Sequence, residues 1–388
     1  MVYRKNLAFQ FYSPTRVLFG EGETKRVGQE VLKLGAKRVA VIMDQGIKDS
    51  ERVRSVVNAL GELCVGIFDE VIQDSGVDLI NRGTAYCLQI RADALVSIGG
   101  GSTIDTAKAI AALVKKGGDD IRKYLGMMKI KEPILPHIAI PTTSGTGSEA
   151  TLYAMIVDRE KGEKKLMGDF HLIPEETILD PLMTINLPPS LTASTGMDAM
   201  SHCIESILSS RHGPITDGLA IQGIRLIREY LPTCVVRGED VEARGMQAVA
   251  ANMAGVAFSN ALIGCVHAMA HALGGKLGVP HGVANAILLP YGMEYNGEVV
   301  PHRYRLIAEA MGFNTMGKDD RECVTVATEK LREFSERIGI SQKLSDWGVK
   351  ENSLEEVAKL ALEDPAMVTN PRRPNHYKEI LSILTRAL

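Results

Sequence analysis

The chain has no stretch of about 20 apolar residues, so a membrane-spanning helix is not expected. Its first segment, Met1–Phe11, lacks the apolar core of a secretory signal peptide. The six cysteines are scattered and include no C-x-x-C pair, a usage typical of reduced, buried thiols. Together these absences predict a cytoplasmic protein.

Clusters of one charge are also lacking. The 44 basic and 47 acidic residues leave a formal charge of −3, and no basic stripe stands out along the 388 residues. Nucleic-acid binding needs clustered Lys and Arg to neutralise phosphates, so nucleic acid is not an expected partner. A content of 45% hydrophobic and 23% charged residues is ordinary for a globular protein, and the length suggests two or three domains.

The first half of the chain alternates short β-type runs with helix-like segments. Buried strands are predicted at Arg38–Met43, Ala94–Ile98 and His137–Ile140, with helices at Glu23–Leu34, Ser50–Leu60, Leu79–Gln89 and Thr103–Val114. A hairpin is predicted from Tyr153–Asp158 and Lys164–Met167, around a turn that contains Gly162. Repeated strand–helix–strand units imply an α/β domain with a mostly parallel sheet covered on both faces.

The second half is predicted to be helical, because long apolar-periodic segments replace the β-branched runs. The predicted helices are Leu191–Leu208, Ile215–Val236, Val241–Ser259, Ile263–Leu273, Arg321–Ile338, Leu354–Leu362 and Tyr377–Leu388. Prolines interrupt regular structure in Asp180–Pro189. We therefore place the domain boundary there, with one domain at residues 1–185 and the other at residues 186–388.

A glycine-rich loop follows the predicted strand Ala94–Ile98. It consists of Gly99, Gly100, Gly101 and Ser102 and leads into a helix. Glycines let backbone N–H groups approach an anion closely, and the helix N-terminus adds partial positive charge. The loop matches neither G-x-G-x-x-G nor the G-K-[ST] of a P-loop NTPase, so taken alone it also fits a simple tight turn.

Two further features support a dinucleotide site. A second polar loop, residues 141–149, follows the next predicted strand, and α/β ligand sites gather where parallel strands end. Asp44 ends the first buried strand. A carboxylate there accepts hydrogen bonds from both ribose hydroxyls and repels a 2′-phosphate, which favours NAD over NADP. The alternative is a turn-forming Asp before Gly46.

Histidines gather in the second half of the chain. His267, His271 and His281 lie within fifteen residues, and His202 follows Asp198 by four. A spacing of four places Asp198 and His202 on one helix face, as it does His267 and His271, whereas glycines and a proline separate His281 from that helix. One carboxylate and three imidazoles suit a divalent transition metal such as Fe(II) or Zn(II), which polarises a substrate oxygen. The alternative is that these histidines have no metal-binding role and lie at the surface or in ordinary hydrogen bonds.

The chain resembles the iron-containing (group III) alcohol dehydrogenases, the family that includes 1,3-propanediol dehydrogenase and lactaldehyde reductase. The resemblance covers nearly the whole chain and rests on GGGSTIDTAKAIA, PTTSGTGSE, TGMDAMSHCIES, VHAMAHALGG and PHGVANAILLP, in that order. It implies an N-terminal Rossmann-like, dinucleotide-binding domain and an all-helical C-terminal domain that carries the metal and substrate sites, the dehydroquinate synthase-like architecture. It also implies an active site in the cleft between the domains and a homo-oligomer.

The resemblance carries site residues over position by position. It implies four metal ligands, Asp198, His202, His267 and His281. His271 matches a histidine near the nicotinamide, and we take it as the catalytic residue that relays the alcohol proton; the alternative is a structural role. The implied cofactor contacts are Asp44, Gly99, Gly100, Gly101, Ser102, Thr142, Thr143 and Lys164. Phe258 and Tyr153 match positions of the substrate pocket. Many relatives have P-N-P where this chain has Gln73-Asp74-Ser75, so Asp74 replaces an amide.

The sequence thus predicts an oxidoreductase that uses Fe(II), or alternatively Zn(II). It would transfer hydride between NAD, with NADP as the alternative, and a small primary alcohol or diol and its aldehyde. Other readings stay open within the superfamily: a glycerol dehydrogenase-like enzyme or a dehydroquinate synthase-like lyase. Two different classes are a zinc hydrolase, which would need a general base beside the metal, and a non-catalytic nucleotide-binding protein. VHAMAH lacks the Glu of H-E-x-x-H, which argues against the hydrolase.

Overall fold

The protein divides into two compact units in the structure, a computed structural model that describes residues 7–161 and 163–388. The sheet unit comprises residues 13–187, and the helical unit comprises residues 188–388 together with residues 7–12. The predicted range 1–185 is therefore wrong at its start. Residues 7–12 belong with the helices, because the Tyr12 N–H donates to Asn260 Oδ1 (2.7 Å) and Asn260 Nδ2 donates back to the Tyr12 carbonyl (3.1 Å). Gly162, expected in the hairpin turn, lies outside the described residues.

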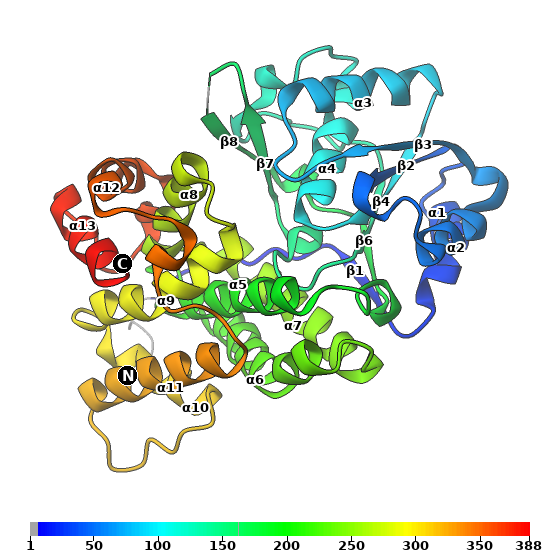
Figure 1. Cartoon of the computed structure of the whole chain (residues 1–388). Coiled ribbons are helices and arrows are strands. Elements are labelled where there is room, and N and C mark those ends of the chain that lie inside the picture. The colour runs from blue at the N-terminus through cyan, green and yellow to red at the C-terminus, as the bar shows by residue number, and fades with distance from the viewer. Residues whose placement is uncertain (1–6, 162) are drawn as a thin grey trace. The chain divides into compact units, whose positions relative to one another are not determined.

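A six-stranded parallel sheet forms the centre of the sheet unit (Figure 1). Its order is β1-β9-β6-β4-β2-β3, with β1 at Arg16–Phe19, β2 at Val39–Asp44, β3 at Cys64–Val71, β4 at Ala94–Gly99, β6 at His137–Pro141 and β9 at Glu176–Leu179. The predicted strands correspond to β2, β4 and β6. The other three were not predicted, since β1 and β3 are half-exposed edge strands and β9 has only four residues.

Helices cover both faces of this sheet, as predicted. They are α1 (Val27–Lys33), α2 (Glu51–Leu60), α3 (Val77–Gln89) and α4 (Gly101–Lys116). Ala40 and Ile42 of β2 are buried in one apolar cluster with residues of α3 and α4. The alternate residues Val39 and Val41 are buried in a second cluster with residues of α1 and α2. The strand is apolar throughout because both of its faces are buried.

A small second sheet carries the predicted hairpin. Strand β7 (Tyr153–Asp158) pairs antiparallel with β8 (Glu163–Gly168), and β5 (Gly126–Met127) pairs parallel with β8. The two sheets are linked through α4, which contacts both β4 and β7. The hairpin is therefore anchored to the helix that begins at the glycine-rich loop.

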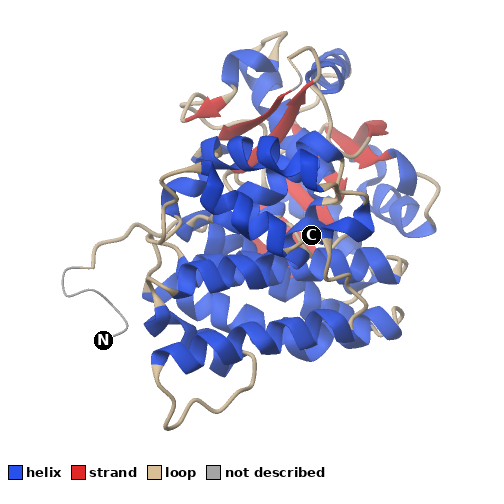
Figure 2. Cartoon of the chain, turned by 60° about the vertical axis from the view of Figure 1, so that its left-hand side comes forward, coloured by secondary structure: helices blue, strands red, loops and turns tan. Residues whose placement is uncertain are grey.

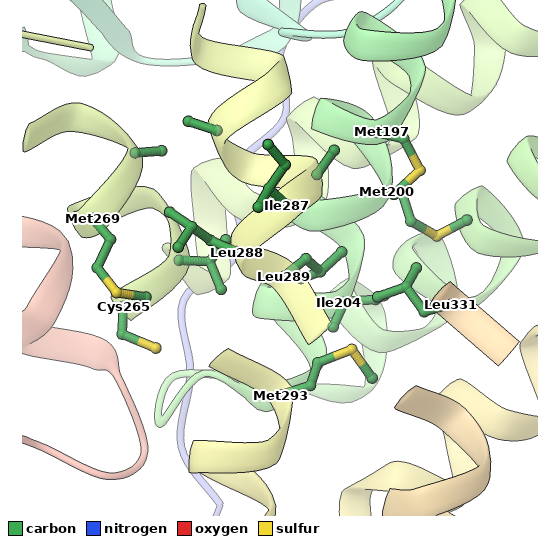
Figure 3. Close-up of a cluster of buried hydrophobic side chains, with 14 of the residues drawn as sticks. Met197, Met200, Ile204, Cys265, Met269, Ile287, Leu288, Leu289, Met293 and Leu331 are labelled. Carbon is green, nitrogen blue, oxygen red and sulfur yellow. The ribbon is translucent and has the colours of Figure 1, made fainter. Parts of the chain in front are cut away.

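The described part of the helical unit contains helices and connecting loops but no strand (Figure 2). Its helices are α5 (Pro189–Leu208), α6 (Pro214–Val236), α7 (Val241–Ala261), α8 (Cys265–Leu277), α9 (His281–Gly297), α10 (Tyr304–Ala310), α11 (Asp320–Arg337), α12 (Leu354–Glu363) and α13 (Tyr377–Arg386). Met197 and Ile204 of α5 and Leu288 of α9 belong to its core (Figure 3). Helix α9 was not predicted, because it is apolar nearly all round and contains Pro290, which conceal its period.

Within the described residues, no single helix is both long enough and apolar enough for a membrane span. Over residues 7–161 and 163–388, the pair α7 and α8 taken together meets these criteria of length and composition, and the two helices are bent by 104° relative to each other.

A buried histidine makes the stability of the sheet unit depend on pH. His137 Nε2 lies 2.7 Å from Ser97 Oγ, and burial, aided by the Lys108 cation, lowers the pKa of His137 to about 3. In the unfolded chain the pKa is about 6.5, so between these values only the unfolded state takes up the proton. The free energy of unfolding is therefore expected to fall as the pH drops through this window.

His137→Gln can keep a hydrogen bond to Ser97 and removes the titration. Between pH 7 and pH 4.5, urea denaturation is expected to show a loss of stability smaller than in the wild type by on the order of 2 kcal/mol. Equal losses in the two proteins would contradict a neutral buried imidazole.

Candidate functional site

Three helices bring a carboxylate and two imidazoles to one point in the helical unit. Asp198 lies on α5, His267 lies on α8, and His281 is the first residue of α9. Each offers a ligand atom, and these atoms all lie within 4.8 Å of one another. Asp198 Oδ1 is 3.4 Å from His281 Nε2 and 3.6 Å from His267 Nε2. His281 comes from a separate element, as predicted from the glycines and proline before it.

His202 lies one helical turn beyond Asp198 but outside the set within 4.8 Å. Its ring stacks on the His267 ring, with centroids 4.5 Å apart and planes at 22°. The His202 ring also stacks on the Phe258 ring, with centroids 4.1 Å apart and planes at 15°. The structure therefore brings three of the four predicted ligands together and places the fourth ring against them.

The donor set fits a divalent transition metal. Asp198 is only 2% exposed, and burial raises its pKa, yet the neighbouring imidazoles outweigh burial and lower the pKa of Asp198 well below its usual range. Burial lowers the pKa of His267, but the Asp198 and Glu205 carboxylates outweigh it and raise the pKa to about 9. His267 Nε2 is buried without a hydrogen-bond partner among the described residues. A site that favours positive charge and leaves a nitrogen without a partner is suited to a cation.

Two side chains that the sequence analysis did not single out support these groups. Asn285 Nδ2 donates to Asp198 Oδ1 (2.7 Å) and lies 3.1 Å from His281 Nε2. Glu205 Oε2 accepts from His267 Nδ1 at 2.5 Å. Spacing could have indicated both, because Asn285 follows His281 by four and Glu205 follows Asp198 by seven, which puts each pair on one helix face.

His271 lies beside the cluster and has a carboxylate partner. Its ring is nearly parallel to the His281 ring, at 13° with centroids 5.4 Å apart. His271 Nδ1 is 2.9 Å from Asp364 Oδ2, and the His271 side chain is 25% exposed. Asp364, which lies just after α12, could not have been found from spacing because 93 residues separate the two. The pair reaches solvent, as a proton relay requires.

In the sheet unit, the predicted cofactor segments follow three neighbouring strands. Strands β2, β4 and β6 are adjacent and parallel, so their carboxyl ends share one edge of the sheet. Asp44 is the last residue of β2, and its Oδ1 accepts a hydrogen bond from the Gly46 N–H (2.7 Å). The turn-forming role left open by the sequence is thus present, and the carboxylate stands at the end of the strand.

The glycine loop packs against the loop that follows β6. A Cβ at Gly101 would lie 2.7 Å from the Thr146 side chain, and one at Gly100 would lie 3.2 Å from the Thr143 side chain. The Thr142 N–H donates to the Gly99 carbonyl (3.0 Å). Helix α4 begins at Gly101 with no side-chain cap. The loop therefore presents the N-terminus of a 16-residue helix with small residues on either side, the chemistry of an anion cradle.

Lys164 is tied to the same loop through Asp74. Lys164 Nζ lies 2.6 Å from Asp74 Oδ1, and the Asp74 N–H donates to Ser102 Oγ at 3.2 Å. Asp74 has a φ of 54°, in the left-handed region that Asp and Asn tolerate best among side chains with a Cβ. Of the two predicted pocket residues, Tyr153 begins β7 of the sheet unit and Phe258 lies on α7 of the helical unit.

A fully buried lysine links α4 to the hairpin. Lys108 Nζ donates to the carbonyls of Thr151 (2.9 Å) and Tyr153 (2.7 Å) and to Ser148 Oγ (3.2 Å). The Asp105 carboxylate lies 3.9 Å away and accepts from the Met155 N–H at 2.9 Å. Burial lowers the pKa of Lys108 to about 8, opposed by Asp105 and Glu149. This network fixes the residues that follow the second polar loop.

The chain is similar to known proteins over nearly its whole length. The sequence pattern described as "Iron-containing alcohol dehydrogenase" matches residues 14–181, and that described as "Fe-containing alcohol dehydrogenase family, C-terminal" matches residues 192–388. The chain is 38% identical to an NAD-dependent methanol dehydrogenase of Bacillus methanolicus, over 97% of this chain and 99% of that one. It is 37% identical to a 1,3-propanediol dehydrogenase of Klebsiella pneumoniae, over 98% of each.

The fold agrees with the sequence matches. An alcohol dehydrogenase from Oenococcus oeni superposes with a TM-score of 0.95 at 34% identity, covering 98% of this chain and all of that chain. The parallel-sheet unit and the helical unit both take part in this match. The chain belongs to the iron-containing alcohol dehydrogenase family.

Proposed function

We propose that this protein is a metal-dependent oxidoreductase that transfers hydride between a nicotinamide cofactor and a small primary alcohol or diol and its aldehyde. The observation that carries the proposal is the convergence of Asp198, His267 and His281 within 4.8 Å in a member of this family. Relatives named for methanol and for 1,3-propanediol support short alcohols as the substrate class.

The metal would be held by Asp198, His202, His267 and His281, with Fe(II) the expected ion and Zn(II) the alternative. When bound, it supplies the Lewis acidity that polarises a substrate oxygen. Asn285 holds the Asp198 carboxylate in place through its 2.7 Å hydrogen bond. Fixed ligands keep the geometry of the site without reorganisation during the reaction.

His271 is the proposed proton relay. The Asp364 carboxylate accepts from Nδ1, so Nε2 of the neutral ring is left as the nitrogen that can take up a proton. Phe258 and Tyr153 are the proposed pocket side chains. Phe258 is supported by its stacking on His202, beside the metal ligands.

For the cofactor, we propose that the N-terminus of α4 receives the pyrophosphate. The residues proposed to contact the cofactor are Gly99, Gly100, Gly101, Ser102, Thr142, Thr143, Lys164 and Asp44. Asp44 would take the ribose hydroxyls and favour NAD over NADP. The close packing of the two loops supports this proposal, because a side chain at Gly101 would collide with Thr146.

The proposal is tested by metal removal together with a substrate screen. Exhaustive chelation should abolish reduction of NAD by methanol, 1,3-propanediol and related short alcohols, and Fe(II) or Zn(II) added under anaerobic conditions should restore it. Net formation of NADH separates this function from that of a lyase that uses NAD only transiently. Full activity in a preparation shown to be free of metal would contradict the proposal.

Cofactor preference gives a separate prediction at Asp44. Asp44→Asn keeps an oxygen for the Gly46 N–H and removes the negative charge that would face a 2′-phosphate. The ratio of kcat/KM for NADP to that for NAD should rise by on the order of tenfold, a change of about 1.4 kcal/mol. An unchanged ratio would assign Asp44 to the turn alone.

We also propose that the protein is a homo-oligomer. Strand β1 lies at the edge of the six-stranded sheet, and its Val17 and Phe19 side chains are 45% and 44% exposed. Apolar side chains on an unpaired edge favour association with another strand. Light scattering of the wild type and of Val17→Lys tests this, and a wild-type monomer would refute it.

A further inference from the structure

We infer that Glu205 is a positioning residue that fixes the tautomer and the orientation of His267, so that Nε2 of this histidine is the nitrogen offered to the metal. The inference rests on the proposed metal centre. It assigns a role to a side chain on α5 that the proposed ligand set does not include.

Both oxygens of the Glu205 carboxylate are used by neighbouring residues at the start of α8. Oε2 is 2.5 Å from His267 Nδ1, and Oε1 accepts from the Val266 N–H at 2.9 Å. Glu205 is 3% exposed, and among the described residues its carboxylate has no lysine or arginine partner within 4 Å. Its negative charge is therefore directed at His267 and at the backbone of α8.

The first residues of α8 offer backbone N–H groups to side-chain oxygens from two other segments. Gly264 precedes the helix and supplies no cap, while the Cys265 N–H donates to Asn370 Oδ1 (3.0 Å). A Cβ at Gly264 would lie 2.5 Å from Asn370 Oδ1 and 3.0 Å from Glu205 Oε1. The first N–H groups of the helix thus have two side-chain acceptors, one of them anionic, which also complements the helix dipole.

The consequence for His267 follows from the chemistry of imidazole. A carboxylate only accepts, so Nδ1 must keep its hydrogen, and the proton that the ring gives up when it takes a metal is the one on Nε2, which leaves the lone pair there. Nε2 of His267 is buried, has no hydrogen-bond partner among the residues that the structure describes, and lies 3.6 Å from Asp198 Oδ1. A carboxylate behind a histidine in this way orients the ring and raises its basicity as a ligand.

Glu205→Gln separates this role from simple capping of the helix. An amide has one acceptor and one donor end, so it can serve either the Val266 N–H or the His267 Nδ1–H but not both. If the amide oxygen accepts from the Val266 N–H, the NH2 group faces His267 Nδ1 and favours the hydrogen on Nε2, where the metal should bind. If the amide is turned the other way, Nδ1 keeps its hydrogen but the Val266 N–H loses its acceptor. Binding a metal through Nε2 therefore costs a hydrogen bond in the variant. The side-chain volume is unchanged, so the fold should persist.

The test measures binding of Zn²⁺ to the metal-stripped full-length protein, by competition with a chromophoric chelator. Glu205→Gln is expected to weaken binding by about 10- to 100-fold. Asn370→Ala is the matched control, since it removes the other acceptor at the start of α8 and should lower the melting temperature while leaving zinc affinity near the wild-type value.

The outcomes are distinguishable. Wild-type affinity in Glu205→Gln, or an equal loss of affinity in Asn370→Ala, would overturn the role of Glu205 and leave the metal centre intact. Failure of the wild type to bind one Zn²⁺ would overturn the metal centre, and this inference with it. A second measurement needs no variant at Glu205: nitrogen NMR of zinc-loaded protein labelled at histidine should show His267 protonated at Nδ1, and protonation at Nε2 would overturn the inference.

Discussion

Asp198→Asn is expected to leave the purified protein with roughly a tenth or less of the bound metal and to lower kcat/KM by about 1000-fold, because Lewis-acid catalysis contributes several kcal/mol. Asp198 Oδ1 is the shared point of the cluster, 3.4 Å from His281 Nε2 and 3.6 Å from His267 Nε2. The substitution removes the negative charge but keeps the size of the side chain. Metal analysis and steady-state kinetics on the same sample measure both effects.

The matched control is Asp320→Asn in the same unit. Its carboxylate is 48% exposed and pairs only loosely with Arg305, at 3.8 Å. Exposed pairs of this kind contribute little, so metal content and kcat/KM should stay near wild type. An Asp198→Asn protein that retained full metal content would remove this carboxylate from the ligand set.

Lys108→Met is expected to lower the free energy of unfolding of the sheet unit by about 3 kcal/mol. It should also raise KM for NAD several-fold, which corresponds to a loss of about 1 kcal/mol in the free energy of NAD binding. The substitution leaves the carbonyls of Thr151 and Tyr153 without their donor and leaves Asp105 without its buried cation. The segment that follows the second polar loop would then lose its anchor on α4.

The measurement must report on the sheet unit alone. The only tryptophan, Trp347, lies in the helical unit, so its fluorescence is the wrong probe. Hydrogen exchange in peptides of α4, compared between wild type and variant, is suitable. Lys115→Met is the control because this exposed lysine is on the same helix. Equal protection of α4 in Lys108→Met and wild type would show that the network is dispensable.

Which strands were predictable depends on where they lie in the sheet. Strands β2, β4 and β6 are buried on both faces, so their apolar runs identify them. The edge strands β1 and β3 carry mixed exposure and lack that signal. Helix α9 was not predicted for the opposite reason: it is buried on nearly all sides, so its sequence has no amphipathic period.

The metal cluster likewise has parts with a local sequence signal and parts without one. The pairs of residues four apart on α5 and α8 could be found from sequence, because helical periodicity determines which side chains share a face. The convergence of the two helices with His281 depends on tertiary packing, so the residue types and the break before His281 indicated only that a metal site was possible, and the family resemblance supplied the particular set of four ligands. The hydrogen bond between His271 and Asp364, which lie 93 residues apart, has no local signal at all.

The connection between the second and third metal-binding helices has a consequence for how this family can vary. Only Gly278, Val279 and Pro280 separate α8 from His281, and Gly278 has a φ of 71°. Because His281 is the first residue of α9, one residue inserted into so short a link would displace His281 from Asp198 unless the end of a helix unwound to absorb it. By contrast, residues 311–319 form a loop whose Met316 is 87% exposed. Insertions and deletions among homologues should therefore accumulate at residues 311–319 and be absent from the three-residue link.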